Sequence, residues 1–155
     1  MKKTMALTAL AAALGCGAAN PAEDARSELR PIARVSLETP KDGLCGGRAI
    51  LNMYQDMFAI ECDSPMTGAH TQLIRNFTEQ NRCDDVLTYS DANGSYISLI
   101  DFGCGGIPDY LEIDYLYVSS FPDAVWQETY PIVTNEMNLE GADLQWRIWD
   151  ARRRR

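Results

Sequence analysis

The pattern of apolar and polar residues first predicts a strand and then a helix. Residues 32–39 (IARVSLET) alternate as in a short strand, and residues 40–43 (PKDG) are a strong turn signal. Over residues 48–60 the apolar side chains recur at intervals of three and four, which is typical of an amphipathic helix. They are Ile50, Met53, Tyr54, Met57 and Phe58. A hairpin that turns at residues 55–56 is the alternative.

A second helix and then strands are expected in the middle of the chain. Residues 64–68 (SPMTG) break the pattern, and a helix is predicted from about residue 69 to residue 82. Residues 86–90 and 95–101 are predicted to pair as a hairpin. The Asn-Gly step between them supplies the positive φ angles that such a turn requires.

The last third alternates apolar and polar residues over 110–119, which predicts a strand covered on one face and partly on both. Asp123 is expected to cap a short helix that ends before Pro131, and residues 144–149 to form a last strand. The sum is an α+β fold, in which two helices pack on a small antiparallel sheet. Residues 31–150 form this single, disulfide-stabilised domain, and residues 151–155 (ARRRR) form a basic tail.

The N-terminal residues have the anatomy of a secretory signal peptide. Lys2 and Lys3 precede an apolar run over residues 5–14, which is too short to span a bilayer. We therefore expect residues 1–15 to direct export into an oxidising compartment of a bacterium. Residues 16–30 are rich in Ala and charged side chains without an apolar period, and are predicted as a flexible tether.

Residues 13–17 (ALGCG) resemble the lipobox of bacterial lipoproteins, in which a Cys after a small residue is lipidated and becomes the mature N-terminus. The resemblance implies lipidation of Cys16, although the usual Leu three places before the Cys is Ala13 here. Gly17 follows the Cys where an Asp would retain the protein in the inner membrane, so the resemblance implies the outer membrane. Ordinary cleavage after Ala19 or Ala22, which would discard Cys16, remains the alternative.

Four further cysteines, Cys45, Cys62, Cys83 and Cys104, predict two structural disulfides. No two of them are close enough for a zinc site or a thioredoxin-like redox motif. Three pairings are possible. A continuous helix over residues 48–60 would hold Cys45 and Cys62 too far apart for a disulfide.

Charge separates the chain into two unequal parts. The formal net charge is −8, and residues 83–146 contain twelve acids without a single Lys or Arg. Such a region repels nucleic acid and anionic headgroups and suits a cation or a basic partner protein. Five aromatic residues in this region or just after it are expected to contact a partner if they face solvent. These are Tyr110, Tyr115, Tyr117, Trp126 and Trp149.

Residues 101–112 (DFGCGGIPDYLE) resemble the calcium loops of EF-hands and thrombospondin type 3 repeats. The resemblance implies oxygen ligands from Asp101, Asp109 and Glu112, with Gly106 at the sixth position. Gly103 and Gly105 stand where two further acids are expected, so the loop implies weak calcium binding at best. A glycine-rich turn held by a disulfide is the alternative that we favour.

The residues predict a binding protein rather than an enzyme. His70 is the single histidine, and no nucleophile or metal motif surrounds it. We expect a non-enzymatic cell-envelope lipoprotein domain of the periplasm or outer membrane, which touches the membrane only through its lipid anchor. It would bind an unidentified protein or cationic partner, and not nucleic acid, through an acidic surface within residues 83–146. A weak calcium-binding module and a small hydrolase, each secreted as a soluble protein, are the alternatives.

Overall fold

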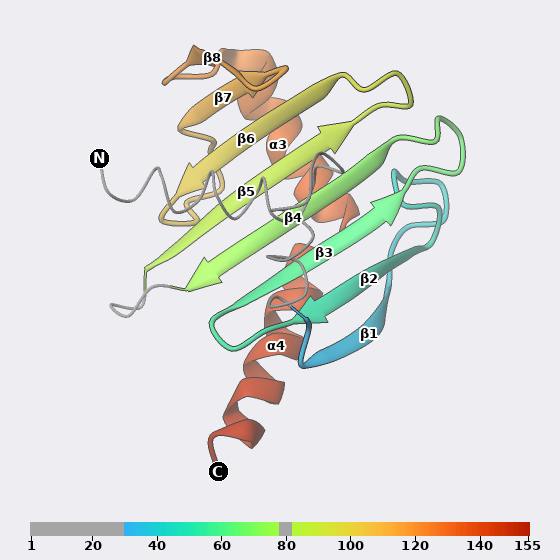
Figure 1. The fold of residues 1–155 in the computed structure, drawn as a ribbon, viewed down its shortest axis with the longest axis vertical. Helices are drawn as coiled ribbons and strands as arrows, with labels where there is room; N and C mark the ends of the chain where they lie inside the picture. Colours follow the sequence, from blue (N-terminus) through green and yellow to red (C-terminus); the bar gives the residue numbers. More distant parts are fainter. Residues whose placement is uncertain (1–29, 78–81) are drawn as a thin grey trace.

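The computed structural model describes residues 30–77 and 82–155, and its centre is one antiparallel sheet of eight strands. The strands follow one another across the sheet in chain order, so each lies beside its neighbour in sequence (Figure 1). They are β1 Ala33–Glu38, β2 Arg48–Met53, β3 Met57–Asp63, β4 His70–Phe77, β5 Cys83–Ser90, β6 Tyr96–Phe102, β7 Tyr110–Ile113 and β8 Leu116–Ser119.

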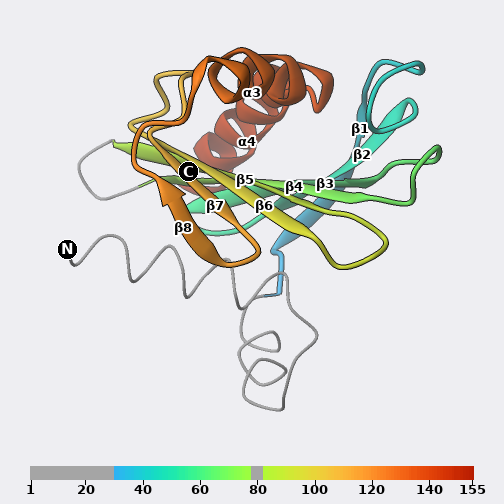
Figure 2. The same ribbon diagram turned by 90° about the horizontal axis from the view of Figure 1, so that it is seen from above.

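Two helices complete the fold, α3 at Ala124–Glu136 and α4 at Leu139–Arg153. Figure 2 shows both helices on the same face of the sheet. The expected α+β fold with two helices on an antiparallel sheet and two disulfides is therefore confirmed. Among the described residues, neither of these two helices is long and apolar enough to cross a membrane.

The core lies between this face and the two helices. A row of aliphatic side chains crosses six strands in register, each paired with the next and almost fully buried. The row consists of Leu51, Ile60, Leu73, Leu87, Leu99 and Leu111. From the helices, Tyr130, Met137, Ala142 and Trp146 complete the same cluster. Burying this apolar face is what holds the helices on the sheet.

Three aromatic rings fasten α4 to the sheet. The Trp146 ring stacks on Phe77 of β4 with a centroid distance of 4.2 Å, and Phe58 of β3 lies beside both rings. The indole N–H of Trp146 donates to the carbonyl of Tyr54 at 3.4 Å. The prediction of a strand over residues 144–149 is wrong, because a single face of a helix brings Trp146 and Ala142 to the sheet together.

The two predicted helices in the first half are strands. Residues 48–60 form β2 and β3, which turn at Gln55 and Asp56, so the alternative hairpin is the correct interpretation. Residues 70–77 of the second predicted helix form β4, and residues 78–81 lie outside the described residues. β3 and β4 each bury four consecutive side chains, and so both faces, and the long sheet gives these strands paired neighbours on both sides.

Because residues 48–60 form a hairpin and not a helix, the expectation that Cys45 and Cys62 lie too far apart for a disulfide is wrong. The Cα atoms of Cys45 and Cys62 lie 5.4 Å apart because β3 folds back along β2, and the two residues are bonded. The second disulfide joins Cys83, at the start of β5, to Cys104 just after β6. The prediction that all four cysteines form two disulfides is confirmed.

Other boundaries differ from the predictions in smaller ways. Asp123 caps α3 as predicted, its carboxylate accepting from the N–H groups of Val125 and Trp126, but the helix continues through Pro131 to Glu136. Tyr130 and Met137 pack on the sheet from either side of Pro131, and this packing outweighs the loss of one helical hydrogen bond. The predicted basic tail begins inside α4, which runs to Arg153.

Candidate functional site

The predicted strand over residues 110–119 is a tight hairpin at the edge of the sheet. β7 and β8 are joined by Asp114 and Tyr115, whose φ angles are 51° and 64°. Positive φ at both positions is the geometry of a two-residue hairpin turn. The Asp114 carboxylate accepts from the N–H of Tyr96 at 3.0 Å, and the Tyr115 ring stacks on Tyr96 with a centroid distance of 4.2 Å. These contacts fix the hairpin against β6.

β8 exposes apolar side chains on both of its faces. A strand at a sheet surface normally buries every second side chain, yet Leu116, Tyr117 and Val118 are all exposed, Leu116 by 70%. The prediction that this strand is covered is therefore wrong for β8. Two further exposed apolar residues follow it along the chain, Phe121, which is 85% exposed, and Val125 in the first turn of α3. We call Leu116, Tyr117, Val118, Phe121 and Val125 the edge patch.

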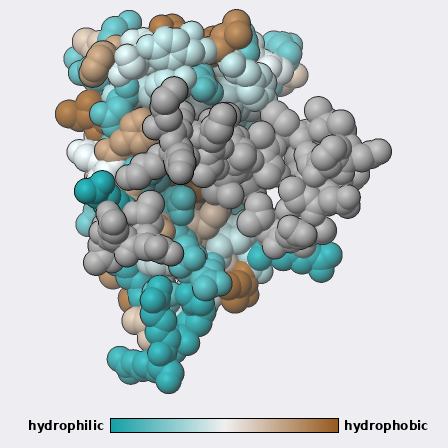
Figure 3. Space-filling model, turned by 60° about the vertical axis from the view of Figure 1, so that its left-hand side comes forward, coloured by the Kyte–Doolittle hydropathy of each residue, from teal (hydrophilic) through white to brown (hydrophobic). Residues whose placement is uncertain are grey.

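The backbone of β8 adds to the exposure of its side chains. Within residues 30–77 and 82–155, β8 is the last strand of the sheet, and β7 alone pairs with it. Its residues, LYVS, contain neither a Lys nor a Pro, the residues that commonly protect edge strands against association. Figure 3 shows brown, hydrophobic atoms at the surface in the upper part of the molecule, the part that contains β8. Large apolar side chains that are exposed close together along the chain are typical of interaction sites, so the edge patch is the candidate site.

The surroundings of the edge patch are acidic. Asp109, Asp114 and Asp123 are exposed, and residues 83–146 contribute no Lys or Arg. The predicted acidic surface is smaller than the sequence indicates, because Asp84, Asp85 and Asp101 are buried. The negative charge that faces solvent near β8 is therefore carried by loop and helix-cap residues.

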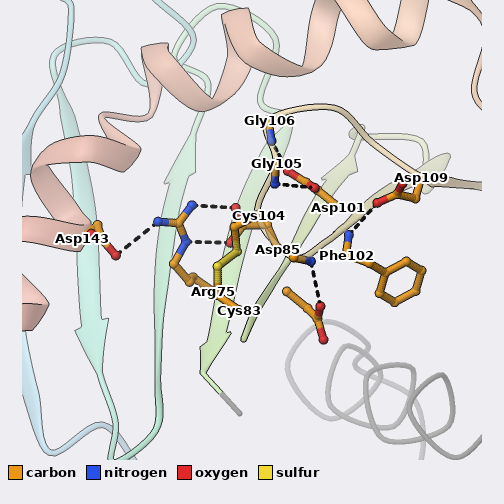
Figure 4. Close-up of a disulfide and its surroundings, with 12 residues drawn as sticks. Arg75, Cys83, Asp85, Asp101, Phe102, Cys104, Gly105, Gly106, Asp109 and Asp143 are labelled. Carbon is orange, nitrogen blue, oxygen red and sulfur yellow. Dashed lines mark hydrogen bonds and ion pairs between the residues drawn. A yellow bond between two sulfur atoms is a disulfide. The ribbon is translucent and has the colours of Figure 1, made fainter. Parts of the chain in front are cut away.

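Two of these buried acids, Asp85 and Asp101, belong to a charged cluster beneath α3 and α4. Arg75 of β4 donates two hydrogen bonds of 2.8 Å to the carboxylate of Asp85 and one of 3.1 Å to Asp143 of α4 (Figure 4). Asp143 also accepts from Arg147 at 2.6 Å. Asp101, opposite Asp85 on β6, accepts from the N–H groups of Gly105 and Gly106. The cluster thus joins three strands to α4.

Burial dominates the ionisation of this cluster. Desolvation raises the pKa of the Asp85 carboxyl, while the hydrogen bonds and charge of Arg75 act against the rise. Desolvation likewise raises the pKa of Asp101, against the two backbone hydrogen bonds. Burial and then the carboxylates of Asp85 and Asp101 raise the pKa of the Tyr130 hydroxyl. These groups are packed into the core beneath the helices, which is the arrangement of a structural cluster.

The residues of the resembled calcium loop are used in different ways. Both carboxylate oxygens of Asp101 accept backbone hydrogen bonds, and Asp109 accepts from the N–H of Phe102 at 2.8 Å. Glu112 lies on β7, paired with Ser98. Among the described residues no three His, Cys, Asp or Glu side chains gather as a metal site. Calcium binding by Asp101, Asp109 and Glu112 stays a prediction.

The remaining predicted residues are placed as follows. Cys16 lies outside the described residues, and its lipidation stays a prediction. His70 begins β4 rather than a helix, and its Nδ1 lies 2.8 Å from the carboxylate of Asp63. Of the five aromatic residues expected to face a partner, Tyr115 and Tyr117 are exposed. Tyr110 is partly buried beside Tyr117, and Trp126 and Trp149 pack against the core.

Four residues of the edge patch, Leu116, Val118, Phe121 and Val125, were not expected to face a partner. The sequence does contain a signal for the first two. From Tyr115 to Val118 four large side chains follow one another without a polar residue between them, whereas a strand with one buried face alternates apolar with polar residues. Comparison of the chain with protein families, with curated proteins and with solved structures finds no match.

Proposed function

We propose that the chain is a non-enzymatic binding protein of the bacterial cell envelope, which holds an extended segment of a partner protein along β8. The observation that carries this proposal is the exposure of Leu116, Tyr117 and Val118 on a strand whose outer edge is unpaired within the described residues. Addition of a strand to such an edge gives backbone hydrogen bonds that supply affinity and side-chain contacts that supply specificity.

The charge around the edge patch selects the chemistry of the partner. Asp109, Asp114 and Asp123 are exposed, with no Lys or Arg between residues 83 and 146 to neutralise them. A partner segment that alternates apolar residues with Lys or Arg fits this surface, since its apolar side chains meet the edge patch and its cations meet the acids. Nucleic acid and anionic lipid do not fit it.

The envelope location rests on the sequence. The export signal over residues 1–15 and the lipobox-like residues 13–17 support a protein anchored through Cys16 on a tether over residues 16–30. The two disulfides agree with an oxidising compartment. An anchored domain of this kind would meet its partner in the periplasm or at the outer membrane.

Site-specific photocrosslinking in the native bacterium tests the interaction. A benzophenone amino acid is placed at Leu116 and, as a matched control, at Leu144, which is an apolar residue of α4 with similar exposure. A discrete adduct from position 116 that is absent from position 144, and that Val118→Asp in the same chain abolishes, supports the proposal. Equal labelling from both positions, or no adduct from either, overturns it.

The anchor needs a separate test. Intact mass of the full-length chain from a bacterial membrane fraction is expected to show a diacylglyceryl-modified N-terminus at Cys16. Reduction is expected to add the mass of four hydrogens for two disulfides. Cys16→Ser is expected to leave an unprocessed chain. A soluble product that begins after Ala19 or Ala22 would overturn the anchor and leave the edge interaction to be judged by the crosslinking alone.

A further inference from the structure

A partly enclosed cavity of about 240 Å³ lies between α3 and the middle of the sheet. Its floor is formed by side chains of β4, β5 and β6, including Leu87, Ile97 and Leu99, and its roof by Trp126, Tyr130 and Val133 of α3. The atoms that face the cavity are apolar. A smaller engineered cavity of ~150 Å³ with such a lining stays dry and binds benzene, so one of this size accepts a larger molecule.

One lining residue has a buried hydroxyl group without a partner. Among the described residues, Thr71 Oγ1 has no hydrogen bond, and Thr71 is only 1% exposed. Buried polar atoms without a partner are rare in folded proteins and call for an explanation. Rotation of Thr71 about its Cα–Cβ bond from one staggered rotamer to the next can bring the hydroxyl to the position of the methyl group, so this hydroxyl can turn toward an occupant of the cavity.

The electrostatics beside the cavity exclude an anionic occupant. Asp85 and Asp101 are paired across β5 and β6 and lie two residues from Leu87 and Leu99, on the same face of the sheet as these two lining residues. A negatively charged ligand would meet these carboxylates, and a charged ligand of either sign would lose its hydration against an apolar wall. The suitable ligand is therefore neutral and mostly hydrocarbon.

We propose that this cavity is a binding site for a small, neutral, apolar molecule that carries one hydrogen-bonding group, which Thr71 meets. The site is separate from the edge patch, whose residues do not line the cavity. A straight-chain alcohol and its carboxylate are matched probes, because they share one hydrocarbon chain and differ in the charge of the head group. Trp126 lines the site, so its fluorescence responds to an occupant.

The experiment measures binding of 1-nonanol and of nonanoate to the full-length chain by Trp fluorescence and by the shift in melting temperature. We expect saturable binding of 1-nonanol with a rise in melting temperature, and binding of nonanoate weaker by about tenfold or more. Equal binding of both probes, or no saturable binding of 1-nonanol, overturns the proposal.

Two variants locate the binding. Val133→Phe fills the cavity from α3 and is expected to abolish the 1-nonanol response, whereas Ile132→Phe places the same ring at the adjacent, exposed position and is expected to leave the response unchanged. If Val133→Phe fails to fold, Ile97→Phe fills the cavity from β6. Thr71→Val keeps the shape of the side chain and is expected to weaken 1-nonanol several-fold, without weakening a hydrocarbon of equal length. A folded filling variant that still binds 1-nonanol overturns the proposal.

Discussion

The centre of the sheet and its β8 edge distribute charge and apolar surface in opposite ways. Beneath the helices, Asp85 and Asp101 are 1% exposed, and Arg75 spans the space between Asp85 and α4. At the edge, Leu116 and Phe121 lie in solvent. The most buried carboxylates and two of the three most exposed large apolar side chains of the described residues thus occur within one stretch of about forty residues.

The difference is explained by the interactions that the buried carboxylates and the edge patch make within the molecule. Asp85 receives two hydrogen bonds from Arg75, and Asp101 receives two from backbone N–H groups. The buried charges are compensated, so they are compatible with a stable core. The side chains of the edge patch have no such compensation, because exposed apolar surface adds nothing to the stability of the free protein. This contrast supports the proposed binding of a partner at the edge.

The largest effect is expected from breaking the charged centre. Arg75→Met removes the partner of Asp85 and one partner of Asp143, and the loss of one member of a buried ion pair costs about 3–5 kcal/mol. Urea unfolding measures the change. Arg34→Met, which breaks an exposed contact to Glu61, is the control, with an expected cost below about 1 kcal/mol. Equal costs for the two variants would contradict the assignment of a buried cluster.

A smaller effect is expected from releasing the loop beside the charged centre. The Cys83–Cys104 disulfide closes a loop of 21 residues next to Asp101. Replacing both cysteines with Ala is expected to lower the free energy of unfolding by about 3 kcal/mol, because the unfolded chain regains the freedom that the disulfide removes. Chemical unfolding without reductant measures this loss. A stability equal to that of the parent chain would show that the disulfide does not constrain the unfolded state.

The pH dependence of stability distinguishes a buried carboxyl group from an exposed one. Burial raises the folded-state pKa of Asp101 above 3.8, so folding favours its protonated form. The contribution of Asp101 is therefore greatest at acid pH and is lost as the pH rises through the raised pKa. The free energy of unfolding is measured for the parent chain and for Asp101→Asn across this pH range. As the pH rises, the parent chain is expected to lose stability relative to the variant.

Asp91 supplies a control of opposite sign. Hydrogen bonds from the backbone of Ser95 and Asn93 lower the pKa of this exposed carboxyl. Its contribution is present above its ordinary pKa and is lost as the pH falls. The parent chain is therefore expected to gain stability relative to Asp91→Asn as the pH rises. The same trend in both variants would contradict the assigned causes.

The smallest change in stability is expected at the edge. Leu116→Ser combined with Val118→Ser is expected to alter the free energy of unfolding by no more than about 0.5 kcal/mol, since both side chains are exposed. Leu99→Ala, in the buried row, is expected to cost about 2–5 kcal/mol. Thermal unfolding compares the two. A large loss from the edge variant would mean that β8 is part of the stabilising core.

Local signals predicted the elements that depend on neighbouring residues. The strand at residues 33–38, the hairpin on either side of Asn93-Gly94 and the cap at Asp123 follow from turn and cap chemistry that acts within a few residues. The class of fold was also predicted correctly, although the two helices expected over residues 48–60 and 69–82 are strands and both helices of the described residues lie after residue 123. Local chemistry was sufficient for the strand, the hairpin and the cap because their conformations satisfy hydrogen bonds within a few residues.

The elements between them required knowledge of the whole sheet. Ile50, Met53, Tyr54, Met57 and Phe58 have helical spacing, but a turn at residues 55–56 places Leu51 beside Ile60 in two strands. In α4, Trp146 and Trp149 suggested a strand, whereas Leu139, Ala142, Trp146 and Trp149 together follow a helical period. The edge patch could be read only in part, because exposure depends on where the sheet ends.

The order of the strands has a consequence for the growing chain, which is synthesised from its N-terminus onward. Each hairpin of the sheet forms from adjacent residues, so β1 to β8 can pair in sequence as they appear. The helices are made last and fasten contacts across the chain, such as Trp146 to Tyr54 and Asn138 to Glu38. Until then one whole apolar face stays uncovered. A chain that stopped near residue 120 would have all eight strands but neither helix, so the apolar face of its sheet would be exposed and prone to aggregation. Protection against aggregation therefore depends on the last thirty-five residues of the sequence.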